Sequence, residues 1–260
     1  MNNDYIPVIS IQGIKKTFTR AKDENLSVLH GIDLDVDQGE FVGLIGYSGC
    51  GKTTLLRIVC GFENADEGLV LLDGLRHDEP DRNMLMLFQD FNQLFPWKTV
   101  FKNVVHPLTS TGFIKSKKEA ERHAMKRIAD VGLSGFERNY PHELSGGMKQ
   151  RTAVARALAL QPRVLLMDEP FAALDNITRR TLQELTRRVC DKYGISVLFV
   201  THSVEEAVIM ADRVVVMNRQ GTIEKVFENP NRAQADPSIQ APLISEIMEV
   251  MNSIENRVAL

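Results

Sequence analysis

Residues 46–53 combine glycines, a lysine and a threonine at a spacing that can hold phosphate groups. The segment reads Gly-Tyr-Ser-Gly-Cys-Gly-Lys-Thr and contains three glycines. Because glycine has no Cβ, such a backbone can curve around an anion and turn its N–H groups inward. Lys52 can reach the β- and γ-phosphates, and the Thr53 hydroxyl can ligate Mg²⁺. The pattern predicts a nucleoside triphosphate as the ligand.

The residues on either side of this loop predict the elements that position it. Residues 40–45 form a short apolar run, which is typical of a buried strand leading into the loop. Residues 51–60 predict the helix that follows, ended by Gly61, and the positive end of its dipole faces the same phosphates. Strand, glycine-rich loop and helix in this order favour a phosphate site over a glycine-rich turn that binds nothing.

A second pair of reactive side chains ends another apolar run. Residues 164–167 read Val-Leu-Leu-Met and deliver Asp168 to the carboxyl end of a buried strand. Ligands of open α/β sheets bind at such ends, and an acid there can hold Mg²⁺ directly or through water. Glu169 follows, placed to polarise the water that attacks the γ-phosphate. The alternative, a solvated acidic turn, is the weaker interpretation beside the phosphate loop.

Residues 144–151, Leu-Ser-Gly-Gly-Met-Lys-Gln-Arg, predict a second anion site. Ser145, Gly146 and Gly147 open a helix, and a small hydroxyl with two glycines at a helix N-terminus can bind an anion. In a two-fold dimer, this site of one copy can close on the nucleotide held by the other copy. An ordinary serine-capped helix start is the alternative interpretation.

The composition is that of an ordinary globular chain. Of its 260 residues, 43% are apolar and 25% are charged, and the formal net charge of −3 offers no bulk attraction for nucleic acid or anionic lipid. No apolar run approaches the roughly 18 residues that span a bilayer, and the N-terminus lacks the pattern of a signal peptide. The three cysteines are scattered, which argues against a disulfide framework or a zinc site and favours a reduced, cytoplasmic setting.

Hydrophobic periodicity predicts an α/β fold. Residues 8–45 have the pattern of strands, and residues 116–132 carry a capping box followed by helical spacing. After residue 162, strands and helices alternate, which favours a mostly parallel sheet covered by helices on both faces. Residues 229–242 contain three prolines and predict a loop. Leu243, Ile247, Val250 and Ile254 then predict a terminal amphipathic helix.

The order of these motifs resembles the ATP-binding cassette (ABC) transporter ATPases. The loop at 46–53 lies far upstream of residues 144–151, which shortly precede Asp168 and Glu169. The resemblance implies a P-loop NTPase core with an N-terminal antiparallel β subdomain and an inserted α-helical subdomain. It implies one ATPase domain over residues 8–228, with the helical subdomain at about 90–162, and a C-terminal loop and helix at 229–260. ATP and Mg²⁺ would be the cofactors, and ATP hydrolysis the reaction.

The resemblance also gives roles to single residues. Gln89 resembles the glutamine that senses Mg²⁺ and water. Residues 173–175, which end in Asp175, resemble the loop that crosses the dimer interface. His202, after the strand expected at 195–201, resembles the switch histidine that contacts the γ-phosphate. The next residue is Ser203, where the family often has Asp or Asn, and we expect its hydroxyl to cap the following helix. Phe18 matches the aromatic position that stacks on adenine, with core packing as the alternative.

The expected site residues form three groups. The catalytic group consists of Lys52, Gln89, Glu169 and His202. The metal ligands are Thr53, Gln89 and Asp168. The nucleotide contacts are Phe18, Gly46, Tyr47, Ser48, Gly49, Cys50, Gly51, Lys52, Thr53, Thr54, Ser145, Gly146, Gly147, Gln150 and Asp175.

A cassette without a membrane span needs a partner that provides the transport pathway. The stretch Phe91–Trp97 is aromatic and contains proline, which suggests a docking surface for a permease, with Trp97 as its anchor. A buried core indole is the alternative for Trp97. The sequence around Trp97 and after Asp175 is similar to that of the nitrate/sulfonate/taurine importer ATPases. This similarity implies uptake of a small anion or related molecule, at the inner face of the cell membrane.

The resemblance implies further partners and leaves other functions open. A second cassette, identical or different, and indirectly a substrate-binding protein would complete the importer, and no nucleic acid is expected. A kinase that passes the γ-phosphate to a small acceptor is one alternative, which residues 145–151 disfavour. A cassette used in DNA repair or translation is another, as is an importer of a different substrate class.

Overall fold

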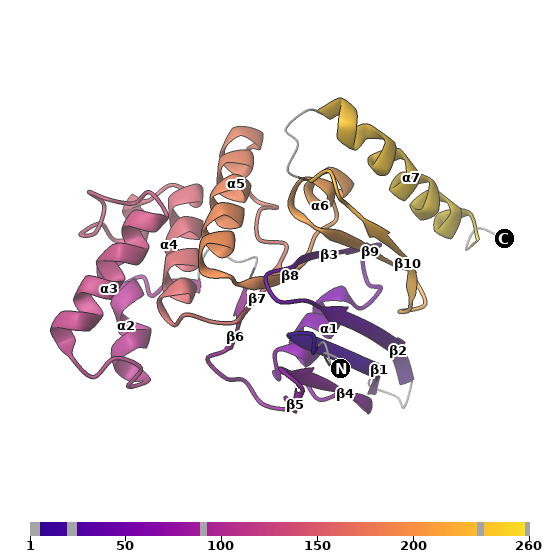
Figure 1. The fold of residues 1–260 in the computed structure, drawn as a ribbon, viewed down its shortest axis with the longest axis horizontal. Helices are drawn as coiled ribbons and strands as arrows, with labels where there is room; N and C mark the ends of the chain where they lie inside the picture. Colours follow the sequence, from indigo (N-terminus) through magenta and orange to yellow (C-terminus); the bar gives the residue numbers. More distant parts are fainter. Residues whose placement is uncertain (1–5, 20–24, 89–92, 233–236, 258–260) are drawn as a thin grey trace, which may run out of the picture. The chain divides into compact units, whose positions relative to one another are not determined.

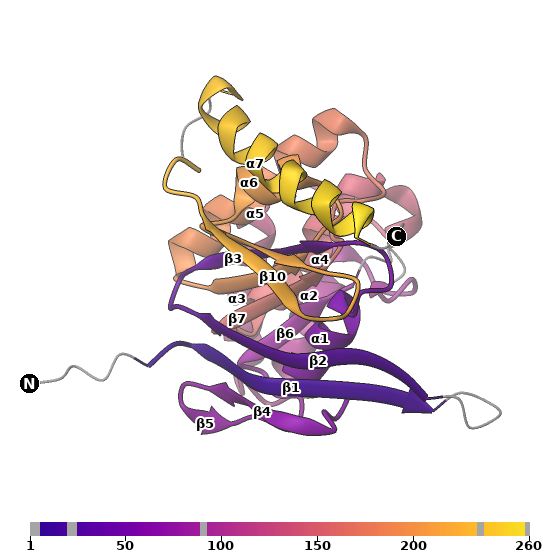
Figure 2. The same ribbon diagram turned by 90° about the vertical axis from the view of Figure 1, so that its right-hand side faces the viewer.

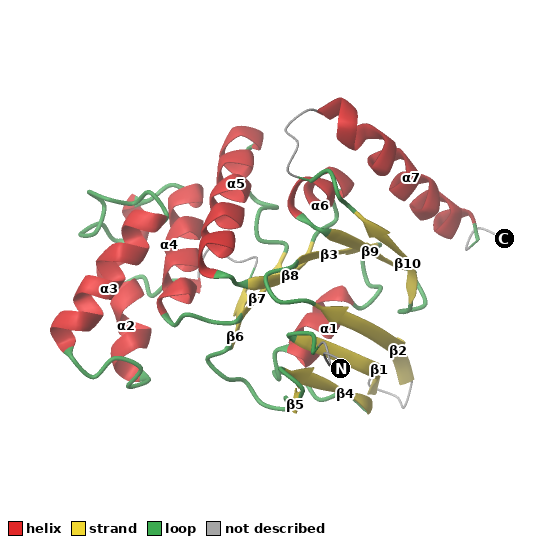
Figure 3. Cartoon of the chain, viewed as in Figure 1, coloured by secondary structure: helices red, strands yellow, loops and turns green. Residues whose placement is uncertain are grey.

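The computed structural model describes residues 6–19, 25–88, 93–232 and 237–257. The chain separates into two compact units. The first, Met1–Pro80 with Ser196–Leu260, contains the phosphate loop and is called the phosphate-loop unit. The second, Asp81–Ile195, is called the helical unit. Figures 1 and 3 show their elements.

The phosphate-loop unit contains a four-stranded antiparallel sheet, visible in Figure 2. Its strands, in the order β2-β1-β4-β5, are β2 (Asn25–Val36), β1 (Ile9–Thr19), β4 (Glu67–Leu72) and β5 (Leu75–Arg76). Alternating side chains of β2, namely Ile32, Leu34 and Val36, are buried, as expected for a half-exposed strand. The turn between β4 and β5 has Asp73 and Gly74 at positive φ, the conformation of a tight hairpin.

A second set of strands in this unit carries the functional loops. Its order is β10-β9-β3-β8, comprising β10 (Ile223–Glu228), β9 (Arg213–Met217), β3 (Phe41–Gly46) and β8 (Ser196–Val200). Strand β3 runs parallel to both β8 and β9, and all residues of β3 and β8 are buried. Continuous apolar runs are typical of parallel strands covered on both faces. Because parallel strands end at the same edge, the loops after β3, β8 and β9 lie together.

The described residues of the same unit form three helices: α1 (Lys52–Val59), α6 (Val204–Met210) and α7 (Pro237–Asn256). Helix α1 follows β3 through the phosphate loop, and α6 follows β8. Helix α7 packs against α6, with Ile247 and Ile254 buried. No helix within the described ranges is both long enough and apolar enough to cross a bilayer.

The helical unit pairs β6 (Met84–Leu87) in parallel with β7 (Val164–Asp168). Its helices are α2 (Val100–Ser110), α3 (Lys117–Asp130), α4 (Gly146–Ala159) and α5 (Asn176–Tyr193), with a short 3₁₀ turn, η2 (Pro141–Glu143), before α4. Helices α2, α3 and α4 pack on one another, and α4 also packs on α5. The small side chains of α4 allow this packing, since all four of its alanines are buried.

One element differs from its prediction at the C-terminus. Residues 229–242 were expected to form a loop, but α7 already begins at Pro237 and contains Pro242. Proline is well tolerated as the first residue of a helix, where its missing N–H has no partner in any case. Pro242 removes one further hydrogen bond near the helix start. The burial of Ile247 and Ile254 offsets that loss.

Candidate functional site

The phosphate loop has glycines where no other side chain fits. A Cβ on Gly46 would lie 2.7 Å from the Met217 carbonyl oxygen and 2.9 Å from Cys50 Sγ. Gly51 has φ 99°, and a Cβ there would lie 2.6 Å from Leu29 Cδ2. Contacts this short force backbone or core atoms to move. The glycines at these two positions therefore follow from the packing of the loop against β9 and β2.

Helix α1 begins differently from α2 to α6. Gly51 is its N-cap and supplies no side-chain acceptor. Each of the others has a side chain that accepts a hydrogen bond from the first turn, namely Thr99, Ser116, Ser145, Asp175 and Ser203. The first-turn N–H groups of a helix carry the positive end of its dipole and suit an anion. The start of α1 thus has the chemistry of a phosphate site.

Lys52 is buried at this site and anchored by the loop itself. Its Nζ donates to the carbonyl oxygens of Gly46, at 2.8 Å, and Tyr47, at 2.9 Å. Cys50 Sγ lies 3.8 Å from the same Nζ. Burial raises the pKa of the Cys50 thiol despite the opposing effect of Lys52, so Cys50 stays protonated and poorly reactive. Cys50 is therefore best explained as a small residue that fits the loop.

His202 lies at the same edge of the sheet as the phosphate loop. Thr201 N donates to the Leu44 carbonyl oxygen at 3.2 Å, which ties the end of β8 to β3 two residues before Gly46. His202 is exposed there. Ser203 Oγ accepts from Glu206 N at 3.2 Å, which confirms the expectation that a hydroxyl caps α6.

Phe18 is exposed, so core packing does not explain it. Its side chain is 36% accessible, and Lys16 Nζ lies 5.1 Å from the ring centroid. Across the β1–β2 ladder Phe18 faces Leu26. Two residues along β2, Val28 Cγ1 would lie 3.0 Å from a Cβ on Gly51. Since a strand rises about 3.3 Å per residue, Leu26, which faces Phe18, lies roughly 7 Å along β2 from Val28, the residue that borders the loop.

The helical unit contains the two predicted acids. Asp168 ends β7 and is half-buried, as is Glu169. Glu169 has φ 45°, in the left-handed region that residues other than glycine seldom adopt. Strain of this kind costs about 1–3 kcal/mol and concentrates at functional sites. The backbone at Glu169 is therefore held in place by its surroundings rather than by its own preference.

The same unit contains the segment around Ser145. Ser145 Oγ accepts from Met148 N at 3.3 Å, so the residue does cap α4, and its hydroxyl hydrogen still provides a donor. A Cβ on Gly147 would lie 2.5 Å from Thr178 Cγ2, so this glycine lets α4 approach α5 closely. Gln150, expected to contact nucleotide, is only 1% exposed, and its Oε1 accepts from Gln93 Nε2 at 3.5 Å. Its carboxamide is thus buried inside the helical unit.

Asp175 and Thr178 connect the start of α5 to this segment. The Asp175 carboxylate accepts from Thr178 N at 3.0 Å, and this hydrogen bond holds the pKa of Asp175 below its usual range. Thr178 therefore touches both Gly147 and Asp175 within the helical unit. Sequence reasoning missed Thr178, because nothing in its local pattern signals a contact with α4.

The predicted docking segment is described from Gln93 onward, and Gln89 and Phe91 lie outside the described residues. Trp97 is 70% exposed, so the alternative of a buried core indole is wrong. Buried Asn103 fixes the loop: its Oδ1 accepts from Phe95 N, and its Nδ2 donates to the carbonyl oxygens of Phe95, Lys98 and Thr99. An exposed aromatic residue on a fixed loop is typical of a binding surface.

Comparison with known proteins places the chain in a family. Residues 29–172 match the family model described as ABC transporter. The chain is 41% identical over 223 residues to the aliphatic sulfonates import ATP-binding protein SsuB of Bacillus cereus, covering 85% of this chain and 86% of that protein. It is 44% identical over 255 residues to the bicarbonate transport ATP-binding protein CmpC of Synechocystis, covering 94% of this chain but only 38% of that relative.

A solved structure gives the same result. The dimeric, post-hydrolysis structure of the ATP-binding cassette MJ0796 bound to ADP and Pi superposes with a TM-score of 0.74 and 30% identity, covering 85% of this chain and 98% of that one. The fold and the motifs are those of an ATP-binding cassette. The chain belongs to the ABC transporter family. The predicted family, importer group, fold class and ATPase activity are therefore confirmed.

Proposed function

We propose that this chain is the ATP-hydrolysing subunit of an importer for a small anion and that it works as one of a pair of cassettes. The observation that carries the proposal is the phosphate loop, in which packing requires glycine at positions 46 and 51 and after which helix α1 begins without a side-chain cap. The relatives SsuB and CmpC are named for aliphatic sulfonates and bicarbonate, which supports a small anion as the solute. The cassette MJ0796 is described as dimeric, which supports the pairing.

The donor chemistry suits MgATP. The Thr53 hydroxyl and the Asp168 carboxylate are hard oxygen donors, and Mg²⁺ at such sites is held by one or two protein oxygens together with phosphate oxygens and water. Bound Mg²⁺ would neutralise charge on the β- and γ-phosphate oxygens. The backbone from Gly46 to Thr54 would bind the phosphates, and Phe18 would stack on the adenine.

Each remaining residue has one role in hydrolysis. The Lys52 ammonium stabilises the charge that develops on the γ-phosphoryl group, and its two carbonyl anchors mean that little reorganisation is needed. Glu169 orients water and accepts its proton, Gln89 senses that water and Mg²⁺, and His202 contacts the γ-phosphate. Ser145 to Gly147 of the second cassette cover the nucleotide, and Asp175 lies at the shared interface. Loss of phosphate removes the charge that bridges the two cassettes, and the dimer reopens.

Hydrolysis and partner are tested together on the protein purified from its native membrane. We expect a permease and a binding protein to accompany it, and phosphate to be released from MgATP without any phosphorylated acceptor. Lys52→Ala should abolish release, whereas Lys118→Ala, on the exposed start of α3, should not. Formation of a phosphorylated small molecule, or co-purification with ribosomes or DNA in place of a permease, would contradict the proposal.

Trp97 tests the docking surface separately. Trp97→Ala should reduce the amount of permease recovered with the cassette while ATP binding stays unchanged, because a buried aromatic anchor carries much of an interface's energy. Leu75→Ala is the matched control, since Leu75 is 74% exposed but lies on β5. Equal permease recovery with both variants would exclude Trp97 as an anchor.

A further inference from the structure

The side chain of Tyr47, inside the phosphate loop, binds the C-terminal helix. Its hydroxyl donates to the Met251 carbonyl oxygen at 2.8 Å and lies 3.4 Å from Glu255 Oε2. The guanidinium of Arg219, in the turn after β9, lies 4.7 Å from the centre of its ring. A residue of the ATP site is thus joined to a helix about 200 positions later in the chain.

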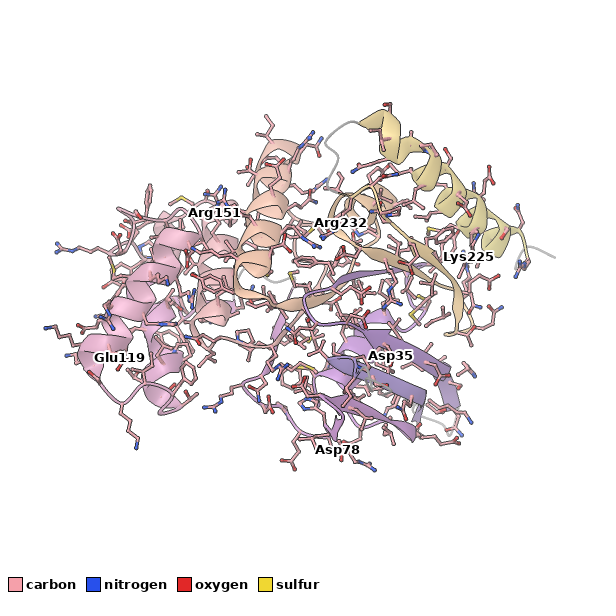
Figure 4. The ribbon with its side chains drawn as sticks, viewed as in Figure 1. Asp35, Asp78, Glu119, Arg151, Lys225 and Arg232 are labelled. Atoms are coloured by element: carbon pink, nitrogen blue, oxygen red, sulfur yellow. The ribbon has the colours of Figure 1, made fainter. Side chains whose placement is uncertain are left out.

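Helix α7 is itself fixed to the unit on both sides of this contact. Ile247 and Ile254 are buried, and α7 packs against α6. Two ion pairs join α7 and its C-terminal end to β10: Lys225 Nζ lies 2.8 Å from Glu246, and Arg257 lies 2.7 Å from Glu224. Figure 4 labels Lys225 on the strand beside α7, and Figure 2 shows the helix along β10. The hydroxyl of Tyr47 therefore binds a stable support.

The main chain of Tyr47 holds the catalytic end of the loop. Its carbonyl oxygen accepts from Lys52 Nζ at 2.9 Å and from Cys50 N at 3.3 Å. The loop around it is rich in glycine, with Gly49 at φ 80° and Gly51 at φ 99°, and glycine loses more conformational freedom on ordering than any other residue. A side-chain restraint on Tyr47 consequently limits the freedom of the loop and of the lysine bound to it.

We infer that Tyr47 is a positioning residue of the phosphate loop and that α7 regulates the ATP site through it. When α7 is docked, the Tyr47 hydroxyl is held and the loop is preorganised for phosphate. When α7 loosens, the loop gains freedom and ATP binds less tightly. Because coupling between two binding events is reciprocal, ATP must in turn stabilise the docking of α7. The inference rests on the proposed ATP site.

Tyr47→Phe removes the hydroxyl and keeps the ring. A neutral hydrogen bond contributes about 0.5–1.5 kcal/mol, so we expect ATP to bind between about two- and tenfold more weakly. KM for ATP should rise by the same factor, and kcat should change much less, because saturating ATP itself orders the loop that holds Lys52. Tyr193→Phe is the matched control, because that hydroxyl donates to Asp130 at 2.6 Å in the helical unit. It should lower stability without changing the affinity for ATP.

Hydrogen exchange measures the reciprocal effect. On adding ATP to the Glu169→Gln protein, amides of residues 247–256 should exchange more slowly, and the additional Tyr47→Phe change should abolish this protection. Ile254→Ala, which loosens α7 near Met251, should weaken ATP binding in the wild-type background but have little further effect in Tyr47→Phe. If the wild-type protein binds ATP and the Tyr47→Phe protein binds it with equal affinity, the inference is overturned and the proposed function stands. A wild-type chain that binds no ATP overturns the proposed function.

Discussion

Replacing Gly147 by alanine tests how closely α4 and α5 are packed. The new Cβ would lie 2.5 Å from Thr178 Cγ2, whereas carbon atoms normally approach to about 3.5–4.0 Å. Thr178 cannot easily turn away, because it is β-branched and its N–H is bound to the Asp175 carboxylate. The start of α5 must therefore shift. Overpacking of this kind costs about 1–3 kcal/mol, partly offset by up to about 1 kcal/mol from the better helix propensity of alanine.

The assay is urea unfolding of four proteins: wild type, Gly147→Ala, Thr178→Ser and the double variant. We expect Gly147→Ala to be less stable than wild type by about 1 kcal/mol, which is a mid-range overpacking cost of about 2 kcal/mol less the gain of about 1 kcal/mol in helix propensity. Serine lacks the Cγ2 methyl, so the double variant should recover most of that loss. Thr178→Ser alone should change stability little, since it keeps the hydroxyl and the capped N–H.

Hydrolysis by the double variant separates packing from phosphate binding. If Gly147 serves packing alone, the double variant should hydrolyse ATP like the wild type. If its backbone also covers the partner's nucleotide, hydrolysis should stay low although stability is restored. Wild-type stability in Gly147→Ala, or no rescue by Thr178→Ser, would refute the packing argument.

Two further predictions concern an ionised carboxylate and a helix cap. Burial raises the pKa of Asp130, but hydrogen bonds from Lys192 and Tyr193 lower it more, so the net pKa of Asp130 is depressed. The ionised carboxylate therefore stabilises the fold at pH values above the ordinary carboxyl pKa, and this stabilisation is lost as the pH falls through the depressed pKa. Asp130→Asn should therefore cost about 1–3 kcal/mol at neutral pH and approach the wild type in strong acid, as measured by urea unfolding across pH; a pH-independent difference would contradict this. Ser203→Asp should keep ATPase activity within about twofold, because either side chain caps α6, whereas Ser203→Ala should lower stability by about 1 kcal/mol. Loss of most activity in Ser203→Asp, measured by phosphate release, would show that Ser203 does more than cap the helix.

The elements that carry chemistry were predictable because their signals are local. Buried strands β3 and β8 read as unbroken apolar runs, and the caps at Ser116 and Ser203 follow from a few neighbouring residues. Each such pattern depends on contacts within one or two turns of chain.

Contacts between distant residues could not be read in this way. The Tyr47 hydroxyl donates to a main-chain carbonyl group on α7. Because every residue has such a carbonyl group, the sequence of α7 does not indicate this hydrogen bond. The approach of Gly147 to Thr178 depends on how α4 and α5 pack. The exposure of Trp97 and the burial of Gln150 likewise depend on tertiary structure. Hydrophobic periodicity does not determine the exposure of a single residue. Helix α7 extends through two prolines because buried isoleucines farther along hold it.

The central claim is that a second cassette completes the ATP site. The most direct measurement is sedimentation of the Glu169→Gln protein with and without ATP, together with a count of bound nucleotide. Since this variant should bind ATP but hydrolyse it slowly, we predict a dimer that holds two ATP molecules and that reverts to monomers when Lys52→Ala is added. A Glu169→Gln protein that binds ATP fully and remains a monomer at every concentration would contradict the account.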